Sequence, residues 1–287
     1  MDAKELNALV HDREAALYDD RFMIRYDGAI GRAVERDVKR LLGKRPSVGR
    51  ALDVACGTGY LAVGLAAAGI AEEVHACDLS PKMLERTRDN ASSSGASVRL
   101  ALCDAERLPY ADATFDLVCA RGALHHVPSP VDALREMRRV LAPGGTAFVV
   151  AEPTAAGERQ VAVVVGLAVR AVEGLRRVRR IARDEEHHQW ELASMAANLH
   201  TFEPAEIAEM ARVAGFSEVS VGSAAWAWVL VLGLNYYLAG EIAFLARNRV
   251  ARTLARSAIE TAAAFDRLIG DRAVPASLRH TVQAVLR

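Results

Sequence analysis

The sequence predicts an α/β protein with a mostly parallel sheet that helices cover on both faces. Three observations carry this prediction. Short apolar runs alternate with stretches of helical periodicity between residues 48 and 152, which is typical of a parallel sheet with helical crossovers. A glycine-containing turn follows the first of these runs. The chain has 287 residues, 52% of them hydrophobic, so it is long enough to bury a complete α/β core.

The apolar runs predict five strands in order. They are residues 51–55, 74–77, 98–102, 114–120 and 146–151. The preceding segment, residues 1–45, is predicted to be helical because apolar side chains recur there at helical spacing. A short helix is expected after Pro204, and a further strand at residues 217–221.

The turn after the first strand has the form of a nucleotide-binding loop. Gly57 and Gly59 have no Cβ atom, so the backbone can adopt positive φ angles and let a ligand approach closely. The helix that starts near Tyr60 would direct its N-terminus at that ligand, and Asp78 could accept hydrogen bonds from both hydroxyls of a ribose. On its own, this pattern is shared with dehydrogenases and with ordinary strand-to-helix turns.

Further motifs follow the glycine turn in a fixed order. They are Cys103-Asp104-Ala105, the run Arg121-Gly122-Ala123-Leu124-His125-His126-Val127, and Leu141-Ala142-Pro143-Gly144-Gly145 before the fifth strand. Together they resemble the class I S-adenosylmethionine-dependent methyltransferases, in particular the small-molecule branch near the ubiquinone/menaquinone C-methyltransferases and many natural-product enzymes. The likeness covers about residues 48–152, with a fainter match at residues 201–221.

The resemblance implies a Rossmann-like sheet of seven strands whose last two pair antiparallel. Residues 225–232 are therefore expected to form the final strand, inserted between its neighbours. We expect five segments: an N-terminal helical lid (1–47), a cofactor-binding core (48–152), a helical cap insertion (153–200), the last helix and antiparallel strands of the core (201–235), and a helical C-terminal extension (236–287).

S-adenosylmethionine is the cofactor that the resemblance implies. The loop from Asp53 to Gly59 would surround its amino-acid end, and Asp78 would hold the ribose. The residues expected to contact the cofactor are Tyr18, Arg25, Asp53, Ala55, Cys56, Gly57, Gly59, Asp78, Leu79, Met83, Cys103, Asp104, Ala105 and Arg121, with Tyr26 and Gly122 beside them. The carboxylate of Asp53 would repel a pyrophosphate but suits an ammonium group, which favours this cofactor over NAD.

Several of these residues have a plain structural alternative. Asp78 and Asp104 can be turn or helix-capping residues, although Ser80 and Pro81 already supply a cap and a first helical position beside Asp78. Met83 can belong to the core, and the aromatic side chains of the leading segment can simply pack against it.

His125 and His126 are the candidate catalytic residues. By resemblance, one of them would face the reacting methyl group, and the ordinary histidine pKa of about 6.5 suits a general base at neutral pH. Adjacent side chains point in different directions, so the pair is a poor metal chelate, and no metal is expected. The sequence does not choose between the two histidines.

The acceptor is expected to be a lipophilic small molecule with oxygen or carbon as the methyl-accepting atom. Enzymes that methylate amide or base nitrogens typically carry an Asn/Asp-Pro-Pro-aromatic segment after the fourth strand, and residues 121–124 depart from it. Two alternatives stay open. One is a nicotinamide-dependent oxidoreductase that shares the glycine turn, and the other is a non-catalytic scaffold that binds S-adenosylmethionine.

Composition limits the partners and the compartment. The 36 basic and 36 acidic residues give a formal charge of zero, so no overall field attracts nucleic acid. The four cysteines show no Cys-x-x-Cys spacing and suit a reducing compartment. Because the first residues lack the apolar core of a signal peptide, the cytoplasm is the expected location.

The segment after Pro153 carries an apolar stripe along a long helix, with arginines on its opposite side between residues 170 and 183. Those arginines either pair with the acidic residues 184–186 as a solvated face, or contact an anionic lipid surface or an acidic substrate. The candidates for the inner wall of a substrate cap are His187, His188 and Trp190.

The uncharged run at residues 224–234 is too short to cross a membrane, since a spanning helix needs about twenty apolar residues. Any membrane contact is therefore expected to be peripheral. The tail from Tyr236 to Arg287 either completes the substrate pocket or forms a homodimer surface.

Overall fold

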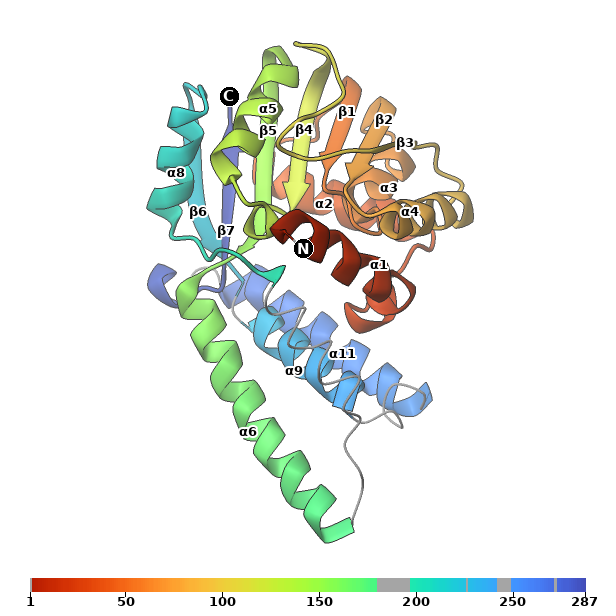
Figure 1. Ribbon diagram of the computed structural model, residues 1–287, viewed down its shortest axis with the longest axis vertical. Coiled ribbons are helices and arrows are strands. Elements are labelled where there is room, and N and C mark those ends of the chain that lie inside the picture. Colours follow the sequence, from red (N-terminus) through yellow and green to blue (C-terminus); the bar gives the residue numbers. More distant parts are fainter. Residues whose placement is uncertain (1, 180–196, 226, 242–248, 271–272) are drawn as a thin grey trace.

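Seven strands form one sheet in the order β3-β2-β1-β4-β5-β7-β6 (Figure 1). The structure is a computed structural model that describes residues 2–179, 197–225, 227–241, 249–270 and 273–287. The strands are β1 (Val48–Val54), β2 (Ala71–Asp78), β3 (Arg99–Leu102), β4 (Phe115–Arg121), β5 (Leu141–Pro153), β6 (Val219–Ala224) and β7 (Thr281–Leu286). Strands β1 to β5 run parallel, and β7 lies antiparallel between β5 and β6. The expected Rossmann-like sheet is confirmed.

Helices cover both faces of this sheet, as expected. On one face lie α5 (Pro130–Val140) and α8 (Pro204–Val213), and on the other lie α2 (Ile30–Leu42), α3 (Tyr60–Ala67) and α4 (Pro81–Ser93). Each face has its own cluster of buried apolar side chains. Leu52 of β1 packs in the cluster beneath α5 and α8, and its neighbour Ala51 packs in the cluster beneath α2, α3 and α4, because successive side chains of a strand point to opposite faces.

Local sequence explains where α3 and α4 begin. Gly59 caps α3 with a φ of +91°, and a Cβ built there would lie 2.7 Å from Cγ2 of Thr87, so only glycine fits. Ser80 caps α4, because its Oγ accepts a hydrogen bond of 3.0 Å from the backbone N–H of Met83, and Pro81 occupies the first helical position. Both helices therefore start at the carboxyl ends of β1 and β2.

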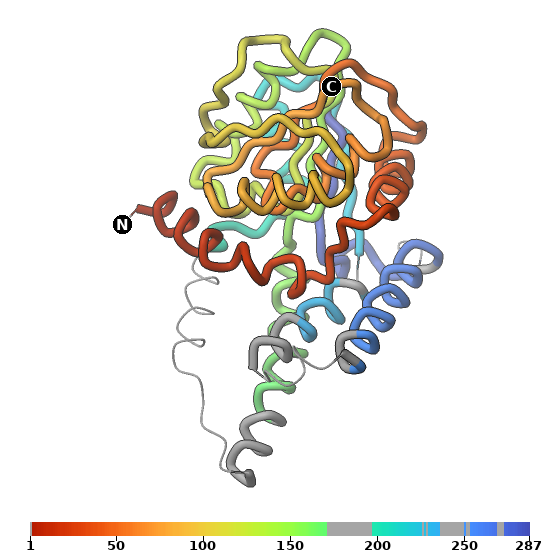
Figure 2. Tube along the Cα trace, turned by 90° about the vertical axis from the view of Figure 1, so that its right-hand side faces the viewer, coloured from red at the N-terminus to blue at the C-terminus, as the bar shows by residue number. Residues whose placement is uncertain are grey.

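Helix α1 (Ala3–Arg21) lies across the carboxyl ends of the parallel strands (Figures 1 and 2). Two polar contacts fasten it to α4. Nε of Arg86 pairs with Asp19 at 2.7 Å, and the hydroxyl of Ser80 donates to Asp12 at 2.5 Å. The helical character predicted for the leading segment is confirmed, and the helix covers the edge of the sheet where ligands of such folds bind.

The final strand lies elsewhere than the sequence suggested. Residues 227–232 are the start of α9 (Ala227–Glu241), and the strand inserted between β5 and β6 is β7 at Thr281–Leu286. The prediction of a strand at residues 225–232 is therefore wrong, as is a purely helical C-terminal extension. In an uncharged run, the pattern of apolar residues does not distinguish a buried strand from a buried helix. Here the run forms a helix that packs against α6 and α11.

Three helices form a helical substructure beyond the carboxyl ends of the strands (Figure 2). They are α6 (Ala155–Arg179), α9 and α11 (Arg249–Phe265), and α9 contacts both of the others. A Cβ at Gly233 would approach Cγ1 of Val161 to 2.9 Å, so glycine allows α9 to pack closely on α6. The expected cap residues His187, His188 and Trp190, and the charged residues 180–186, lie outside the described residues. In the described part of the chain, no helix has an apolar stretch long enough to cross a membrane.

Candidate functional site

A cavity of about 90 Å³ lies between α1 and the carboxyl ends of β1, β2 and β4. The expected site residues that line it are Tyr18, Asp53, Ala55, Cys56, Gly57, Asp78, Leu79, Cys103, Asp104, Ala105, Arg121, Gly122 and His126. Lys4, Asn7 and His11 of α1 line it too. Sequence reasoning missed these three because no motif marks the side of α1 that faces a ligand.

Asp53 is a buried carboxylate near the end of β1. It is 2% exposed, and its Oδ2 accepts a hydrogen bond of 2.9 Å from the backbone N–H of Ala62 in the first turn of α3. Burial raises the pKa of Asp53 to about 7, with a further upward contribution from Asp78. A cation placed beside this carboxylate would favour its charged form, so the position suits an ammonium group.

Asp78 joins the glycine turn to the start of α4. Its Oδ2 accepts a hydrogen bond of 2.8 Å from the N–H of Gly57, and its Oδ1 accepts one of 2.9 Å from the N–H of Ser80. Burial raises the pKa of Asp78, and these backbone hydrogen bonds oppose that shift. Each carboxylate oxygen keeps a second lone pair, so Asp78 has capacity for two further donors from a ligand.

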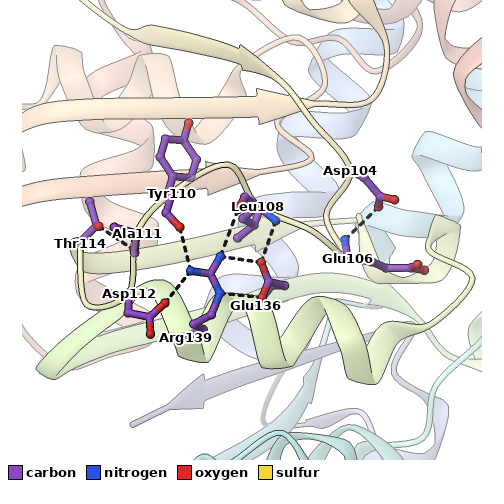
Figure 3. A network of polar contacts seen from close by, with 9 residues as sticks. All are labelled: Asp104, Glu106, Leu108, Tyr110, Ala111, Asp112, Thr114, Glu136 and Arg139. Atoms are coloured by element: carbon purple, nitrogen blue, oxygen red, sulfur yellow. Dashed lines mark hydrogen bonds and ion pairs between the residues drawn. The ribbon is translucent and has the colours of Figure 1, made fainter.

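Asp104 meets α1 at the edge of the cavity. Its Oδ2 lies 2.6 Å from Nζ of Lys4, and Lys4 also pairs with the carboxylate of Glu106. The Oδ1 of Asp104 accepts a hydrogen bond of 2.9 Å from the backbone N–H of Glu106 (Figure 3). Lys4 therefore holds the beginning of α1 against the loop that follows β3.

Arg139 on α5 anchors that same loop further along (Figure 3). Its guanidinium donates to the backbone oxygens of Leu108 at 3.0 Å and Tyr110 at 2.7 Å. It forms ion pairs with Glu136 at 2.7 Å and with Asp112 at 2.8 Å. Because a planar guanidinium directs its donors in a fixed geometry, α5 sets the conformation of the loop on this wall of the cavity.

Arg121 and Tyr18 bring a positive charge and an aromatic ring to the wall. Arg121 ends β4, and its Cζ lies 4.7 Å from the centroid of the Tyr60 ring, a cation–π contact. Tyr18 packs against Phe22 with ring centroids 4.4 Å apart. Burial raises the pKa of Tyr18 to about 12, so its hydroxyl remains protonated at neutral pH.

His126 lines the cavity, and its tautomer is determined by a backbone contact. Its Nδ1 lies 3.0 Å from the carbonyl oxygen of Ala197, which can only accept, so Nδ1 carries the proton and Nε2 the lone pair. Burial, with the neighbouring His125 and His11, holds the pKa of His126 well below its usual range. The ring is therefore neutral at physiological pH.

His125 lies behind that wall and is held by Glu152, which is not among the expected site residues. The carboxylate of Glu152 is fully buried and accepts hydrogen bonds from the N–H groups of Ala123 at 2.8 Å, Leu124 at 3.0 Å and His125 at 3.1 Å. It also accepts from Nδ1 of His125 at 2.9 Å. The ring of His125 lies 3.9 Å from that of His126 between centroids. An acidic residue at the end of a buried apolar run was the available signal.

Five of the residues expected at the site do not line the cavity. Gly59 caps α3 behind it, Met83 is fully buried, and His125 is paired with the buried glutamate. Arg25 is exposed and pairs with a neighbouring aspartate at 2.5 Å. Tyr26 supports the glycine turn instead, because its hydroxyl lies 2.9 Å from a threonine hydroxyl of that turn.

The four cysteines are all free thiols. Burial raises the pKa of Cys56 well above its usual range, so it remains a thiol at neutral pH and is a poor nucleophile. Within the described residues, no three side chains of His, Cys, Asp or Glu gather closely enough to hold a metal ion.

Comparisons with known proteins place this site in a family. The family described as "Methyltransferase domain" matches residues 52–149. A demethylmenaquinone methyltransferase of Geobacillus kaustophilus is 35% identical over 176 residues, which cover 60% of this chain and 72% of that protein. The chain belongs to the class I S-adenosylmethionine-dependent methyltransferases. The resemblance found in the sequence is confirmed.

Two further methyltransferases extend the comparison. The ubiquinone/menaquinone biosynthesis C-methyltransferase UbiE of Cupriavidus metallidurans is 44% identical over 101 residues, 35% of this chain and 42% of that protein. The chain thus spans about two fifths of the length of such UbiE relatives. A phosphoethanolamine N-methyltransferase 2 of Haemonchus contortus, in complex with S-adenosyl-L-methionine, matches 89% of this chain and 52% of its own with a TM-score of 0.55 and 18% identity, which shows the fold alone.

The methyltransferase cofactor, S-adenosylmethionine, fits the chemistry of the cavity. Asp78 offers acceptor positions beside Gly57, where φ is +55° and no atom lies within 4 Å of a Cβ built on that residue. The volume of about 90 Å³ is smaller than the roughly 300–1,000 Å³ of small-molecule pockets. The cavity must therefore widen to admit a molecule of that size.

Proposed function

We propose that this methyltransferase transfers the methyl group of S-adenosylmethionine to an oxygen or carbon atom of a lipophilic small molecule such as a quinone or phenol. The observation that carries the proposal is the convergence of Asp53, Asp78 and Asp104 on one cavity, from the ends of three neighbouring strands. Ligands of open α/β sheets bind at this edge.

Each carboxylate suits one part of the cofactor. Asp78, with a free lone pair on each oxygen, would bind the two ribose hydroxyls. Asp104 would accept a hydrogen bond from the adenine amino group once Lys4 moves away with α1. Asp53, whose pKa burial raises to about 7, would take its charged form beside the methionine ammonium. On this assignment α1 is the lid of the cofactor site.

The cofactor supplies an activated methyl group on its sulfonium. The residues of the chain then have to hold the acceptor in line, exclude water, and take up a proton where the acceptor is a hydroxyl. The cavity wall includes the apolar Leu79, Ala105 and Val127, and residues of α1 line its outer side. Positioning and exclusion of water therefore account for most of the expected rate enhancement.

His126 is the residue we assign to the proton. It lines the cavity, and because its Nδ1 proton is engaged by the carbonyl of Ala197, the lone pair lies on Nε2. Because its pKa lies well below the usual range, the ring is unprotonated before each turnover. His125 would act through it, since Glu152 orients His125 and the two imidazoles lie in contact, with centroids 3.9 Å apart and planes tilted by 39°.

The acceptor class is supported by the relatives and by one departure in the sequence. The Geobacillus kaustophilus protein is named a demethylmenaquinone methyltransferase, and the Cupriavidus metallidurans protein a ubiquinone/menaquinone biosynthesis C-methyltransferase. Residues 121–124, after β4, lack the Pro-Pro segment expected for nitrogen methylation of amides and bases. A lipophilic phenol or hydroquinone combines an ionisable hydroxyl with an adjacent nucleophilic carbon.

Methyl transfer from labelled S-adenosylmethionine to a panel of acceptors tests the proposal. Lipophilic phenols and hydroquinones should become labelled, whereas peptides and nucleic acids should not. His126→Ala should lower kcat by about 10²-fold or more and leave the binding of S-adenosylhomocysteine within about twofold. The matched control is His75→Ala, an imidazole on β2 that pairs with Glu73 and does not line the cavity. Labelling of peptides or nucleic acids alone would refute the proposed acceptor class.

A further inference from the structure

The beginning of α1 contacts the segment that carries His126. Nδ2 of Asn7 lies 3.3 Å from the backbone oxygen of His126 and 3.4 Å from that of Ala197. Both partners are carbonyl oxygens that can only accept, so the amide nitrogen of Asn7 faces them and has one proton for each. Asn7 therefore joins two segments that lie 119 and 190 residues further along the chain.

The carbonyl oxygen of Ala197 is also the group that determines the tautomer of His126. It lies 3.0 Å from Nδ1 of the His126 ring, and its two lone pairs allow it to accept from that ring and from Asn7 together. The chain just after Ala197 is fastened to the same segment, because the N–H of Leu199 donates to the backbone oxygen of His125 at 2.8 Å. Asn7 thus completes a junction of three segments at His126.

His11 follows Asn7 by one helical turn and contacts the same imidazole. Nδ1 of His11 lies 2.9 Å from the backbone oxygen of Asn7, so this nitrogen donates and fastens the His11 ring to its own helix. The ring meets that of His126 edge-on, with centroids 4.8 Å apart and planes at 86°. Asn7 and His11 both line the cavity. Because residues four apart lie on the same side of a helix, one side of α1 contacts both the backbone and the ring of His126.

We propose that Asn7 is a positioning residue for the methyl transfer, which holds the imidazole of His126 in the orientation and tautomer that the reaction uses. This inference rests on the proposed role of His126 as the proton acceptor. Without the amide, the backbone oxygens of His126 and Ala197 lose the donor that joins them, so the ring gains freedom to turn and to exchange its proton between the two nitrogens. A displacement of about 1 Å at a reacting group can cost about 10²-fold in rate, so the loss of orientation should appear in kcat.

Magnetic resonance of histidine labelled with nitrogen-15 tests this positioning without any acceptor molecule. The signals of His126, identified by their loss in His126→Ala, should show one tautomer in the native chain, with the proton on Nδ1. Asn7→Ala should raise the population of the other tautomer at least about fivefold, the effect of losing one hydrogen bond. Alanine favours the helix, so α1 itself is retained. The control Leu9→Ala shortens a side chain of the same helix that is 47% exposed, and should leave the tautomer unchanged.

Kinetics with labelled S-adenosylmethionine, and the acceptor that becomes labelled in the panel above, show whether this orientation serves the reaction. Asn7→Ala should lower kcat at least about tenfold and leave KM for S-adenosylmethionine within about threefold. In the His126→Ala background the same substitution should change kcat by less than about twofold, because the group that it positions is gone. Leu9→Ala should keep kcat within about twofold in both backgrounds.

Three results would overturn the inference. They are a native tautomer in Asn7→Ala, an equal change of tautomer in Leu9→Ala, and additive losses of kcat in the double variant, which would mean a purely structural role. Calorimetric titration of Asn7→Ala with S-adenosylhomocysteine should give an affinity within about threefold of native, and a loss above about tenfold at native kcat would assign Asn7 to cofactor binding instead. Native methyl transfer by His126→Ala would refute the proposed base. The tautomer measurement does not depend on that result, so the two failures are distinguishable.

Discussion

The carboxyl edge of the sheet and the helical substructure differ in which side chains they bury and which they expose. At the sheet edge, Asp53 and Glu152 are buried and Asp78 is partly buried, and all three accept hydrogen bonds from backbone N–H groups. In the helical substructure, aliphatic side chains such as Leu167 and Leu254 face solvent, and arginines outnumber carboxylates. The first arrangement holds charged groups in a fixed geometry, whereas the second leaves apolar side chains exposed. Buried charge and exposed apolar surface therefore belong to separate parts of the chain.

The largest expected effect is at Asp53, where burial opposes the charged form. Its folded-state pKa is about 7 against an ordinary 3.8, so its contribution to stability is present below about pH 4 and is lost as the pH rises through about 7. Asp53→Asn should therefore raise the free energy of unfolding at about pH 8 by up to about 4 kcal/mol and flatten its pH dependence between about pH 4 and 7.

Urea unfolding of the native protein and the Asp53→Asn variant at several pH values measures this effect. The asparagine oxygen can still accept the hydrogen bond from Ala62, so that contact is retained. Parallel pH profiles for the two proteins would mean that Asp53 is solvated. Asp53 would then not count among the buried charges that distinguish the sheet edge from the helical substructure.

Glu152 should show the next largest effect. Glu152→Ala leaves three backbone N–H groups and the imidazole of His125 without their acceptor, which should lower the free energy of unfolding by about 3 kcal/mol. Glu218→Ala, whose side chain is 71% exposed, should stay within about 0.5 kcal/mol. Urea midpoints measure both, and equal losses would contradict the special role of the buried carboxylate.

The two glycines of the turn give a finer comparison. Gly59→Ala places a Cβ 2.7 Å from Thr87 at a φ of +91°, and should cost about 3 kcal/mol. Gly57→Ala meets no atom within 4 Å at a φ of +55°, so only the left-handed backbone is penalised, by about 1 kcal/mol. Thermal unfolding should rank the variants in this order, and the reverse order would show that the turn has a different conformation in solution.

The smallest effects are expected on the outer faces of the helical substructure. Leu167→Ser and Leu254→Ser each change a side chain that is more than 60% exposed, at 62% and 66%. Each should alter the free energy of unfolding by less than about 0.5 kcal/mol. A loss above about 1 kcal/mol in urea would indicate that these faces are covered in solution.

The sequence predicted the sheet edge better than the helical substructure, for a physical reason. Gly57, Asp78 and Asp104 follow buried strands at spacings that the strand-turn-helix unit constrains, so their convergence could be anticipated. Lys4 and His11 could not be, because only the tertiary packing of α1 brings them to the cavity. Glu152, like Asp78, is an acidic residue at the end of a buried apolar run. This pattern therefore indicates a structurally important carboxylate even where no known motif covers the residue.

The misplaced strand has a different cause. Residues 225–232 lack charge and any alternation of polar with apolar side chains, so their periodicity separates no strand from a helix. The strand order was nevertheless anticipated, because the last strand does insert between its neighbours. The inserted strand is formed by Thr281–Leu286, after the helices α9 and α11. Local sequence patterns do not show how far along the chain that strand lies.

Calorimetric titration with S-adenosylhomocysteine, beside NAD, tests the central assignment most directly. The native chain should bind S-adenosylhomocysteine and not NAD. Asp78→Ala should lose at least about tenfold in affinity, because the ribose hydroxyls lose a partly buried charged acceptor. The control Asp89→Ala removes an exposed carboxylate from α4, the helix that follows Asp78, and this variant should bind like the native chain. Binding of NAD instead, or unchanged affinity in Asp78→Ala, would contradict the cofactor site described above.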